Sequence, residues 1–270
     1  MQSKFRRLVL VGALWSLSGA TLAQVSAGGV ASGFSASVAL TPVAGSQTPA
    51  TGVLGSLGNN IISSFSNGSA TATTLTYSEV GSFALNTSAV VGGYLGTAGL
   101  NLDALVFNAA GAAQTRVGRF RPANFVLSSP SVGHRSGRSC AVVPTFTYLG
   151  EDFQLGFTLT AKNAAGATTQ NYTGSFARLD LATAANFKLA GIGGSTPFKT
   201  SNSRLSTSAS SGTWSNGVAA GITLTARALR TTTPDGPFDT AEFGIAPADP
   251  DGVTMASLDL DTRSEERRVG

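Results

Sequence analysis

Cysteine and histidine are almost absent from the sequence: the 270 residues include one of each, Cys140 and His134. A single cysteine excludes an internal disulfide framework, so Cys140 is buried, free, or paired with a segment outside this sequence. A zinc site needs three or four ligands, and no further cysteine or histidine is present to complete one. We therefore predict no metal-binding residues and interpret His134 as part of a polar loop.

The same scarcity argues against nucleophilic catalysis, because a Ser-His-Asp or Cys-His system needs a base that a third group holds in place. No glycine-rich phosphate loop stands between a strand pattern and a helix pattern. A pair of carboxylates for glycoside hydrolysis stays open, since such pairs form in space rather than in sequence. However, Glu79, Glu151 and Glu242 lie in segments typical of loops or strand edges. The prediction is a non-enzymatic protein with no catalytic and no cofactor-binding residues.

A surplus of positive charge is also missing from most of the chain. The formal net charge of +4 arises at the two ends, because residues 24–262 hold twelve basic and twelve acidic side chains. A nucleic-acid-binding protein carries a basic surface that neutralises phosphates. The balance of charges therefore excludes nucleic acid as the expected partner.

The longest apolar run, residues 8–17 (LVLVGALWSL), is too short to span a bilayer. Three basic residues precede it, and small residues stand one and three positions before Gln24. This pattern predicts a cleaved secretory signal over residues 1–23, with a short buried helix as the alternative. The mature chain offers no candidate for a membrane span. We expect an exported protein that is located in the periplasm, at the cell surface or outside the cell.

The remaining charges are unevenly distributed. Basic side chains gather without any acid between residues 116 and 138, and acidic side chains gather without any base between residues 235 and 261. Either these are two solvated loop regions, or the two segments attract one another within a molecule or between neighbours. The basic residues are Arg116, Arg119, Arg121, Arg135 and Arg138, and the acidic residues are Asp235, Asp239, Glu242, Asp249, Asp251, Asp259 and Asp261.

The chain is rich in Gly, Ala, Ser and Thr, with scattered Phe and Val, a composition typical of short strands and tight turns. Residues 153–161 (FQLGFTLTA) alternate apolar and polar side chains over nine positions, which predicts a strand with one buried face. Residues 163–166 follow as a turn, and residues 176–181 (FARLDL) continue the alternation. No amphipathic helix pattern is found, so the many short strands favour β-sandwich modules.

One phrase occurs twice. Residues 65–76 read FSNGSATATTLT and residues 214–225 read WSNGVAAGITLT, with seven of twelve positions identical. Asn-Gly favours a type I′ turn, which needs positive φ at both central positions. After the second turn, the alternation predicts that Val218, Ala220 and Ile222 share one face of a strand with Leu224. We interpret the phrase as an aromatic-led turn that feeds a strand, used in two related modules.

The division into modules is predicted from turn residues. The polar stretch SPSVGHRSGRSC (residues 129–140) carries Pro and Gly and follows a short strand candidate, so we place the module boundary there. An abrupt change to charged residues near the end reads as a non-native tail, with a native charged tail as the alternative. The expected organisation is a signal peptide over 1–23, a first, shortened β-sandwich-like module over 24–128, a linker over 129–139, a second, incomplete module over 140–262, and the tail over 263–270.

The acidic string at residues 249–252 (DPDG) suggests a calcium loop, but the EF-hand spacing fails at Val253 and at the twelfth position, where Leu260 replaces the required Glu. A turn is the simpler interpretation. A looser calcium site formed by Asp249, Asp251 and Asp259 stays open, since extracellular β modules often carry such sites at their junctions.

Longer motifs carry a family resemblance. They are TYSEVGSFAL (76–85), YLG (94–96), VGRFRPANF (117–125), CAVVPTFTYLGEDFQLGFTLTAKNAAGATTQNYTGSFARLDL (140–181), WSNGVAAGITL (214–224), DGPF (235–238) and FGIAPADPDGV (243–253). In this order they resemble the conserved domain, of unknown function, of MshQ-like proteins. Those proteins are associated with biogenesis of the mannose-sensitive haemagglutinin (MSHA) type IV pilus of Gram-negative bacteria. The chain departs from the family in length, because members are usually much longer.

The resemblance implies an exported structural or adhesive protein with tandem immunoglobulin-like β-sandwich modules, and it brings no catalytic residues with it. The expected partners are pilus or cell-surface proteins, with surface glycans as a further option. The alternative function is a secreted carbohydrate-binding module, which needs an exposed aromatic platform. The aromatic residues considered for it are Trp214, Tyr148, Tyr172 and Phe198, of which Trp214, at the start of a strand, is expected in the core.

Overall fold

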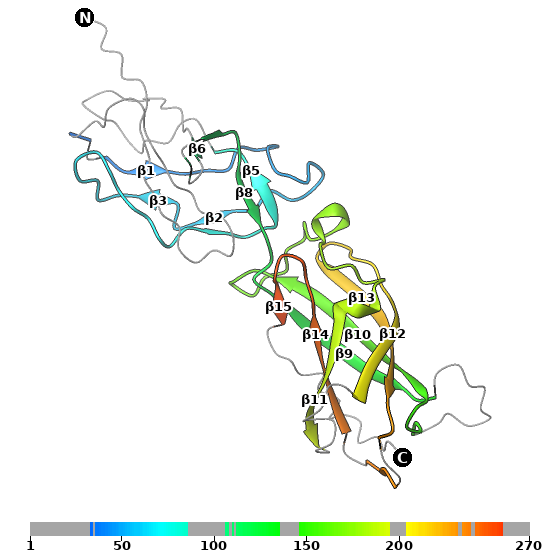
Figure 1. The fold of residues 1–270 in the computed structure, drawn as a ribbon. Helices are drawn as coiled ribbons and strands as arrows, with labels where there is room; N and C mark the ends of the chain where they lie inside the picture. Colours follow the sequence, from blue (N-terminus) through cyan, green and yellow to red (C-terminus); the bar gives the residue numbers. More distant parts are fainter. Residues whose placement is uncertain are drawn as a thin grey trace, which may run out of the picture. The chain divides into compact units, whose positions relative to one another are not determined.

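The structure is a computed structural model that describes residues 33–34, 36–85, 106–107, 110, 112–135, 146–194, 204–231, 234–238 and 241–255 (Figure 1). The predicted signal peptide (1–23), Cys140, Asp259 and the tail (263–270) lie outside these residues. The chain divides into two compact units, residues 1–121 and residues 122–270. The described part of each unit is built from strands and turns, and the described helical segments are two short 3-10 turns of the second unit, η1 and η2. The prediction of an all-β fold with tandem modules is therefore confirmed.

The first unit pairs very short strands two by two. β1 lies antiparallel to β3, β2 to β4, β5 to β8 and β6 to β7. Its core includes a stack of rings, in which the centroid of Phe83 lies 4.5 Å from that of Tyr77 and 5.8 Å from that of Phe120. The strands are β1 (Val38–Ala39), β2 (Leu57–Gly58), β3 (Ile61–Ile62), β4 (Thr76–Tyr77), β5 (Gly81–Phe83), β6 (Val106–Phe107), β7 (Ala113–Gln114) and β8 (Val117–Phe120).

The second unit contains a five-stranded sheet in the order β12-β13-β10-β9-β15 and a two-stranded sheet of β11 and β14 (Figure 1). Neighbouring strands are antiparallel, except that β15 runs parallel to β9 and pairs Thr254 with Asn124. The elements are β9 (Asn124–Gly133), β10 (Asp152–Lys162), η1 (Gly174–Phe176), η2 (Ala184–Asn186), β11 (Phe187–Gly194), β12 (Leu205–Ser211), β13 (Val218–Ala228), β14 (Ala241–Pro247) and β15 (Thr254–Met255).

Strand β10 is the centre of the second unit, and its alternation is the one predicted from the sequence. Every second side chain from Phe153 to Ala161 is at most 3% exposed, because this face points into the core. Two contacts join the sheets face to face: the ring of Phe153 lies 5.3 Å from that of Phe243 on β14, and the ring of Phe157 lies 5.8 Å from that of Phe187 on β11. The arrangement is sandwich-like, as expected for two sheets that share one apolar core.

The repeated phrase forms the same turn in both units. Asn67 and Gly68 have φ values of 50° and 74°, and Asn216 and Gly217 have values of 47° and 77°. In each copy the residues that flank the turn exchange two backbone hydrogen bonds, with N···O distances between 2.8 and 3.0 Å. These are the features of the predicted type I′ turn. Gly217 is further constrained, because a Cβ atom there would overlap the Thr169 carbonyl oxygen.

The strand after the second turn corrects one prediction. Val218 and Ala220 do not face the core with Ile222; Ala219 does, and it is fully buried. The reason is a β-bulge: Leu159 pairs with Ala219, whereas Phe157 pairs with Ile222, so two residues of β13 oppose one residue of β10. Gly221, at φ 64°, supplies the left-handed conformation that such a bulge uses.

The predicted linker over residues 129–139 is wrong in its first part. Residues 124–133 form β9, which pairs along its length with β10, and the boundary between the units falls between Arg121 and Pro122. Pro130 is tolerated inside this strand because the register shifts there, so that Ser129 and Pro130 together oppose one residue of β10. The polar composition that suggested a loop belongs to the solvent-facing side of a strand.

The strand predicted over residues 176–181 is also absent. Leu179 and Leu181 are buried and Asp180 is exposed, as the alternation required, but the backbone turns instead of pairing. The Asp180 carboxylate accepts hydrogen bonds from the Ala182 amide (2.9 Å) and the Thr183 hydroxyl (2.6 Å). These local bonds hold the pKa of Asp180 below its usual value and favour a turn over a sheet ladder.

Candidate functional site

The acidic loop at residues 249–253 is a structural turn. Asp249 is 8% exposed, and its Oδ2 atom accepts hydrogen bonds from the amides of Asp251 (2.9 Å) and Val253 (3.2 Å). Its Oδ1 atom accepts a hydrogen bond from the Tyr172 hydroxyl at 3.1 Å. Both carboxylate oxygens of Asp249 are thus engaged within the protein. Among the described residues, no three His, Cys, Asp or Glu side chains gather as a metal site would require.

Tyr172 connects this turn to the core of the second unit. Its ring is fully buried and lies 4.8 Å from that of Trp214 and 5.6 Å from that of Phe125. The Trp214 indole N–H donates to the Leu179 carbonyl (3.0 Å), and the Tyr172 hydroxyl accepts from the Leu179 amide (3.0 Å). We call Phe125, Tyr172, Trp214 and Asp249 the Tyr172 cluster. Trp214 and Tyr172, considered as parts of a carbohydrate platform, instead hold the sandwich together.

The Tyr172 cluster makes the second unit sensitive to alkaline pH. Burial raises the pKa of Tyr172 well above its ordinary value of 10, so the folded protein keeps this proton at a pH where the unfolded chain has lost it. Because the folded state then binds more protons, the free energy of unfolding falls as the pH rises above about 10. We expect urea midpoints, followed by far-ultraviolet circular dichroism, to fall across this range, and to fall less in Tyr172→Phe. An equal fall in both proteins would contradict this assignment.

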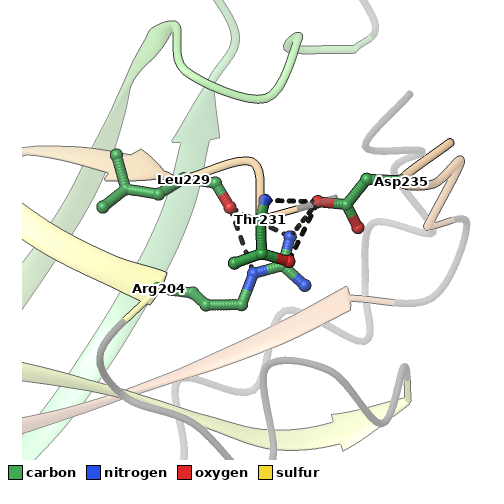
Figure 2. Close-up of polar contacts among 4 residues, drawn as sticks. All are labelled: Arg204, Leu229, Thr231 and Asp235. Carbon is green, nitrogen blue, oxygen red and sulfur yellow. Dashed lines mark hydrogen bonds and ion pairs between the residues drawn. The ribbon is translucent and has the colours of Figure 1, made fainter. Parts of the chain in front are cut away.

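A second buried polar contact was not found by reasoning from the sequence (Figure 2). Arg204 precedes β12, and its Nη2 atom lies 2.7 Å from the Oδ2 atom of Asp235, with both side chains less than 10% exposed. The guanidinium also donates to the Leu229 carbonyl, from Nε at 3.1 Å and from Nη2 at 2.9 Å. The Thr231 amide donates to the same Asp235 oxygen at 2.9 Å. This ion pair fixes the loop between β13 and β14, and it joins Asp235 to Arg204 rather than to the predicted basic segment.

The Arg-rich segment also has local partners. Arg116, in the first unit, donates to the side chain of Ser82 (2.9 Å) and to the Ser46 carbonyl and the Thr48 hydroxyl. Arg135, in the second unit, forms an ion pair with Glu151, with Nε 3.2 Å from Oε2. Both arginines therefore hold neighbouring loops of their own unit together.

Arg135 belongs to the one group that brings an exposed aromatic ring together with charged side chains in the described part of the chain. Tyr148 is 51% exposed, and the Arg135 guanidinium carbon lies 5.2 Å from its ring centroid. The ring of Phe146 meets that of Tyr148 edge to face, at 5.1 Å and 83°. The Tyr148 amide is 3.4 Å from Oε2 of Glu151. We call Arg135, Phe146, Tyr148 and Glu151 the Tyr148 cluster, and we treat it as the candidate site.

His134 lies beside the Tyr148 cluster without joining its rings. Its Nδ1 atom is 3.0 Å from the Thr147 hydroxyl, which also accepts the Arg135 amide at 3.2 Å. The histidine therefore helps to hold the end of β9 against residues 146–148. His134 lies in the bend that follows Gly133, the last residue of β9, so it stands just outside the strand, as the polar-loop interpretation expected.

Of the carboxylates considered for glycoside hydrolysis, Glu151 belongs to the Tyr148 cluster, and the side chain of Glu242 lies outside the described part of the structure. Glu79 is buried in the first unit, where its Oε2 atom lies 3.4 Å from the Val80 amide, whereas Glu151 belongs to the second unit.

The sequence did contain a signal for the Tyr148 cluster. Phe146 and Tyr148 stand two positions apart before β10, a spacing that places two side chains on the same side of an extended chain. None of the helical segments in the described ranges is long and apolar enough to cross a membrane.

Residues 79–268 match the family described as DUF6701, third domain. This range includes the whole described part of the second unit and the last strands of the first. No curated protein and no solved structure matches the chain.

Proposed function

The chain belongs to the DUF6701 third-domain family, and we propose that it is an exported, non-enzymatic structural or adhesive protein associated with the biogenesis of a type IV pilus of the MSHA kind, or with surface attachment. The resemblance of its motifs to MshQ-like proteins supports the pilus association. The apolar run and small residues at the N-terminus support export. In this proposal the protein works by presenting loops and faces of its β modules to a partner at the cell surface.

The observation that carries the proposal is the contrast between the two kinds of polar group in the second unit. Asp249 and Asp235 are buried, and their carboxylates are engaged in contacts that hold the sandwich together. Tyr148 and its charged neighbours instead lie at the surface. A stable sandwich with one organised surface cluster suits a protein that binds rather than one that reacts.

The proposal is tested in a bacterium that carries the gene. We expect an epitope-tagged protein to be recovered outside the cytoplasm, and deletion of the gene to reduce the number of pili or surface attachment, with a plasmid copy restoring the loss. No hydrolysis of ester, peptide or glycoside substrates should disappear with the gene. A cytoplasmic location, or pili and attachment that are unchanged on deletion, would contradict the proposal.

The alternative function, a secreted carbohydrate-binding module, is favoured by one observation. Tyr148 is an exposed aromatic residue with hydrogen-bonding side chains beside it, which is what a sugar-binding platform needs. The other aromatic residues considered for this role do not supply such a platform, because Tyr172 and Trp214 belong to the Tyr172 cluster and Phe198 lies outside the described residues.

A further inference from the structure

Tyr148 is unusual among the exposed apolar side chains of the described residues. The other large ones are aliphatic: Val53, Ile61, Val126 and Leu229. Single exposed aliphatic residues are common on protein surfaces and need no explanation. An aromatic ring that is half exposed and has charged partners is different, because such rings provide a large contact area at a low entropic cost when a ligand binds.

The contacts around Tyr148 fix its orientation before any ligand arrives. Phe146 abuts the ring edge to face, and Arg135 lies over one face of the ring, 5.2 Å from its centroid, so a ligand can stack only on the opposite face. Glu151 holds both the Arg135 guanidinium, by the ion pair at 3.2 Å, and the Tyr148 amide. A site whose side chains are held in place in the free protein loses less conformational entropy on binding.

The polar atoms of the Tyr148 cluster leave donors and acceptors beside the ring. Within the described part of the chain, the Nη atoms of Arg135 and the hydroxyl of Tyr148 form no hydrogen bond. The Glu151 carboxylate makes its contacts through Oε2, which leaves Oε1 as an acceptor. The side chains of Arg135 and Glu151 are 26% and 24% exposed, so solvent reaches both. The site thus offers two donors from a planar guanidinium, one carboxylate acceptor and one hydroxyl.

The charges of the cluster decide between ligand classes. Arg135 and Glu151 neutralise one another, so the site has no net charge with which to select a phosphate, a carboxylate or a cation. A ligand that fits has one apolar face for the ring and several neutral hydroxyl groups at its edge. Sugar rings have this construction, because their axial C–H groups form an apolar face and their hydroxyls pair with planar donors and acceptors.

We propose that the Tyr148 cluster is a binding site for a neutral carbohydrate, with the sugar ring stacked on Tyr148 and its hydroxyls bonded by Arg135 and Glu151. This inference rests on the proposed function in that it names the ligand class through which an adhesive protein would attach. A proline-containing peptide is the main competitor for an exposed tyrosine, but the proline ring that would stack there has no hydroxyl and no N–H for Arg135 and Glu151 to bond.

The test uses the mature chain on an array of neutral and acidic glycans, followed by calorimetric titration with the neutral oligosaccharide that binds best. We expect Tyr148→Ala to weaken this binding about tenfold or more, as for other central contacts. Glu151→Gln should also weaken it, whereas Tyr148→Phe, which keeps the ring, should retain most of it. Val126→Ala is the matched control, because it removes an exposed apolar side chain at the opposite end of β9 from Arg135 and should change nothing.

Three results would overturn the inference. The protein could bind no neutral glycan on the array, Tyr148→Ala could leave glycan binding unchanged, or the protein could prefer a proline-containing peptide to every glycan. A loss of folding is not an explanation for weakened binding if the variant unfolds at the same urea concentration as the native chain. The failure of this inference is separable from that of the proposed function. If the protein is found at the cell surface but binds no glycan, only the carbohydrate-site inference is contradicted. If it binds a glycan but is found in the cytoplasm, only the proposed function is contradicted.

Discussion

Replacing Arg204 by Met, or Asp235 by Leu, is expected to destabilise the second unit by about 3–5 kcal/mol, because each single change leaves a buried charge without its partner. The pair has little access to solvent, with side chains 8% and 6% exposed, so water cannot replace the lost contact. Asp235 also accepts the Thr231 amide, and Arg204 donates to the Leu229 carbonyl. The measurement is urea unfolding of the chain from Gln24 onward, followed by the fluorescence of Trp214.

The double variant Arg204→Met/Asp235→Leu separates the pair from its surroundings. It should recover a large part of the lost stability, because no unpaired charge then remains in the core. The matched control is Arg227→Met, which removes the exposed ion pair with Asp152 (2.8 Å) and should have a much smaller effect. If the exposed and buried pairs gave equal losses, the Arg204–Asp235 contact would not be a determinant of stability.

Truncation of Tyr172 to Ala is expected to cost the second unit about 3–5 kcal/mol, the range for removing a buried aromatic side chain. The ring is fully buried between Phe125 and Trp214, so its loss leaves a cavity. The milder change Tyr172→Phe keeps the ring but removes the bonds to Asp249 and Leu179. It should cost about 1–3 kcal/mol, because two buried polar groups lose their partner.

The comparison of the two variants tests the roles of ring and hydroxyl separately. Unfolding is measured with urea and far-ultraviolet circular dichroism, since both variants alter the environment of Trp214. Tyr148→Ala is the control, because that ring is half exposed and its removal leaves no buried cavity. A Tyr172→Phe variant as stable as the native chain would show that the turn at Asp249 forms without the tyrosine.

Local patterns predicted the parts of the fold that depend on neighbouring residues. The alternation from Phe153 to Ala161 corresponds to β10, since a central strand with one buried face must alternate. The Asn-Gly turns were predicted equally well, because positive φ at two successive positions strongly restricts the residues that fit. The all-β class followed from the same signals.

The errors arose where pairing with another strand overrides the pattern of the local sequence. The bulge at Gly221 shifts the face of Val218 and Ala220, and nothing in β13 itself announces the extra residue. Pro130 read as a loop signal because the strand that accommodates it, β10, begins more than twenty residues later. The Arg204–Asp235 pair could not be predicted either: its members stand 31 positions apart and become partners only through the pairing of β12 with β13.

The parallel pairing of β15 with β9 has a mechanical consequence. Thr254 lies beside Asn124, and both strands run in the same direction from that point, so the chain enters the second unit along β9 and passes β15 in the same sense. A tension that pulls residue 122 and residue 255 in opposite directions would load the bonds between these strands together, in shear. Hydrogen bonds that are loaded in shear must break simultaneously rather than one after another. This strand pair is therefore where such a tension would first be resisted.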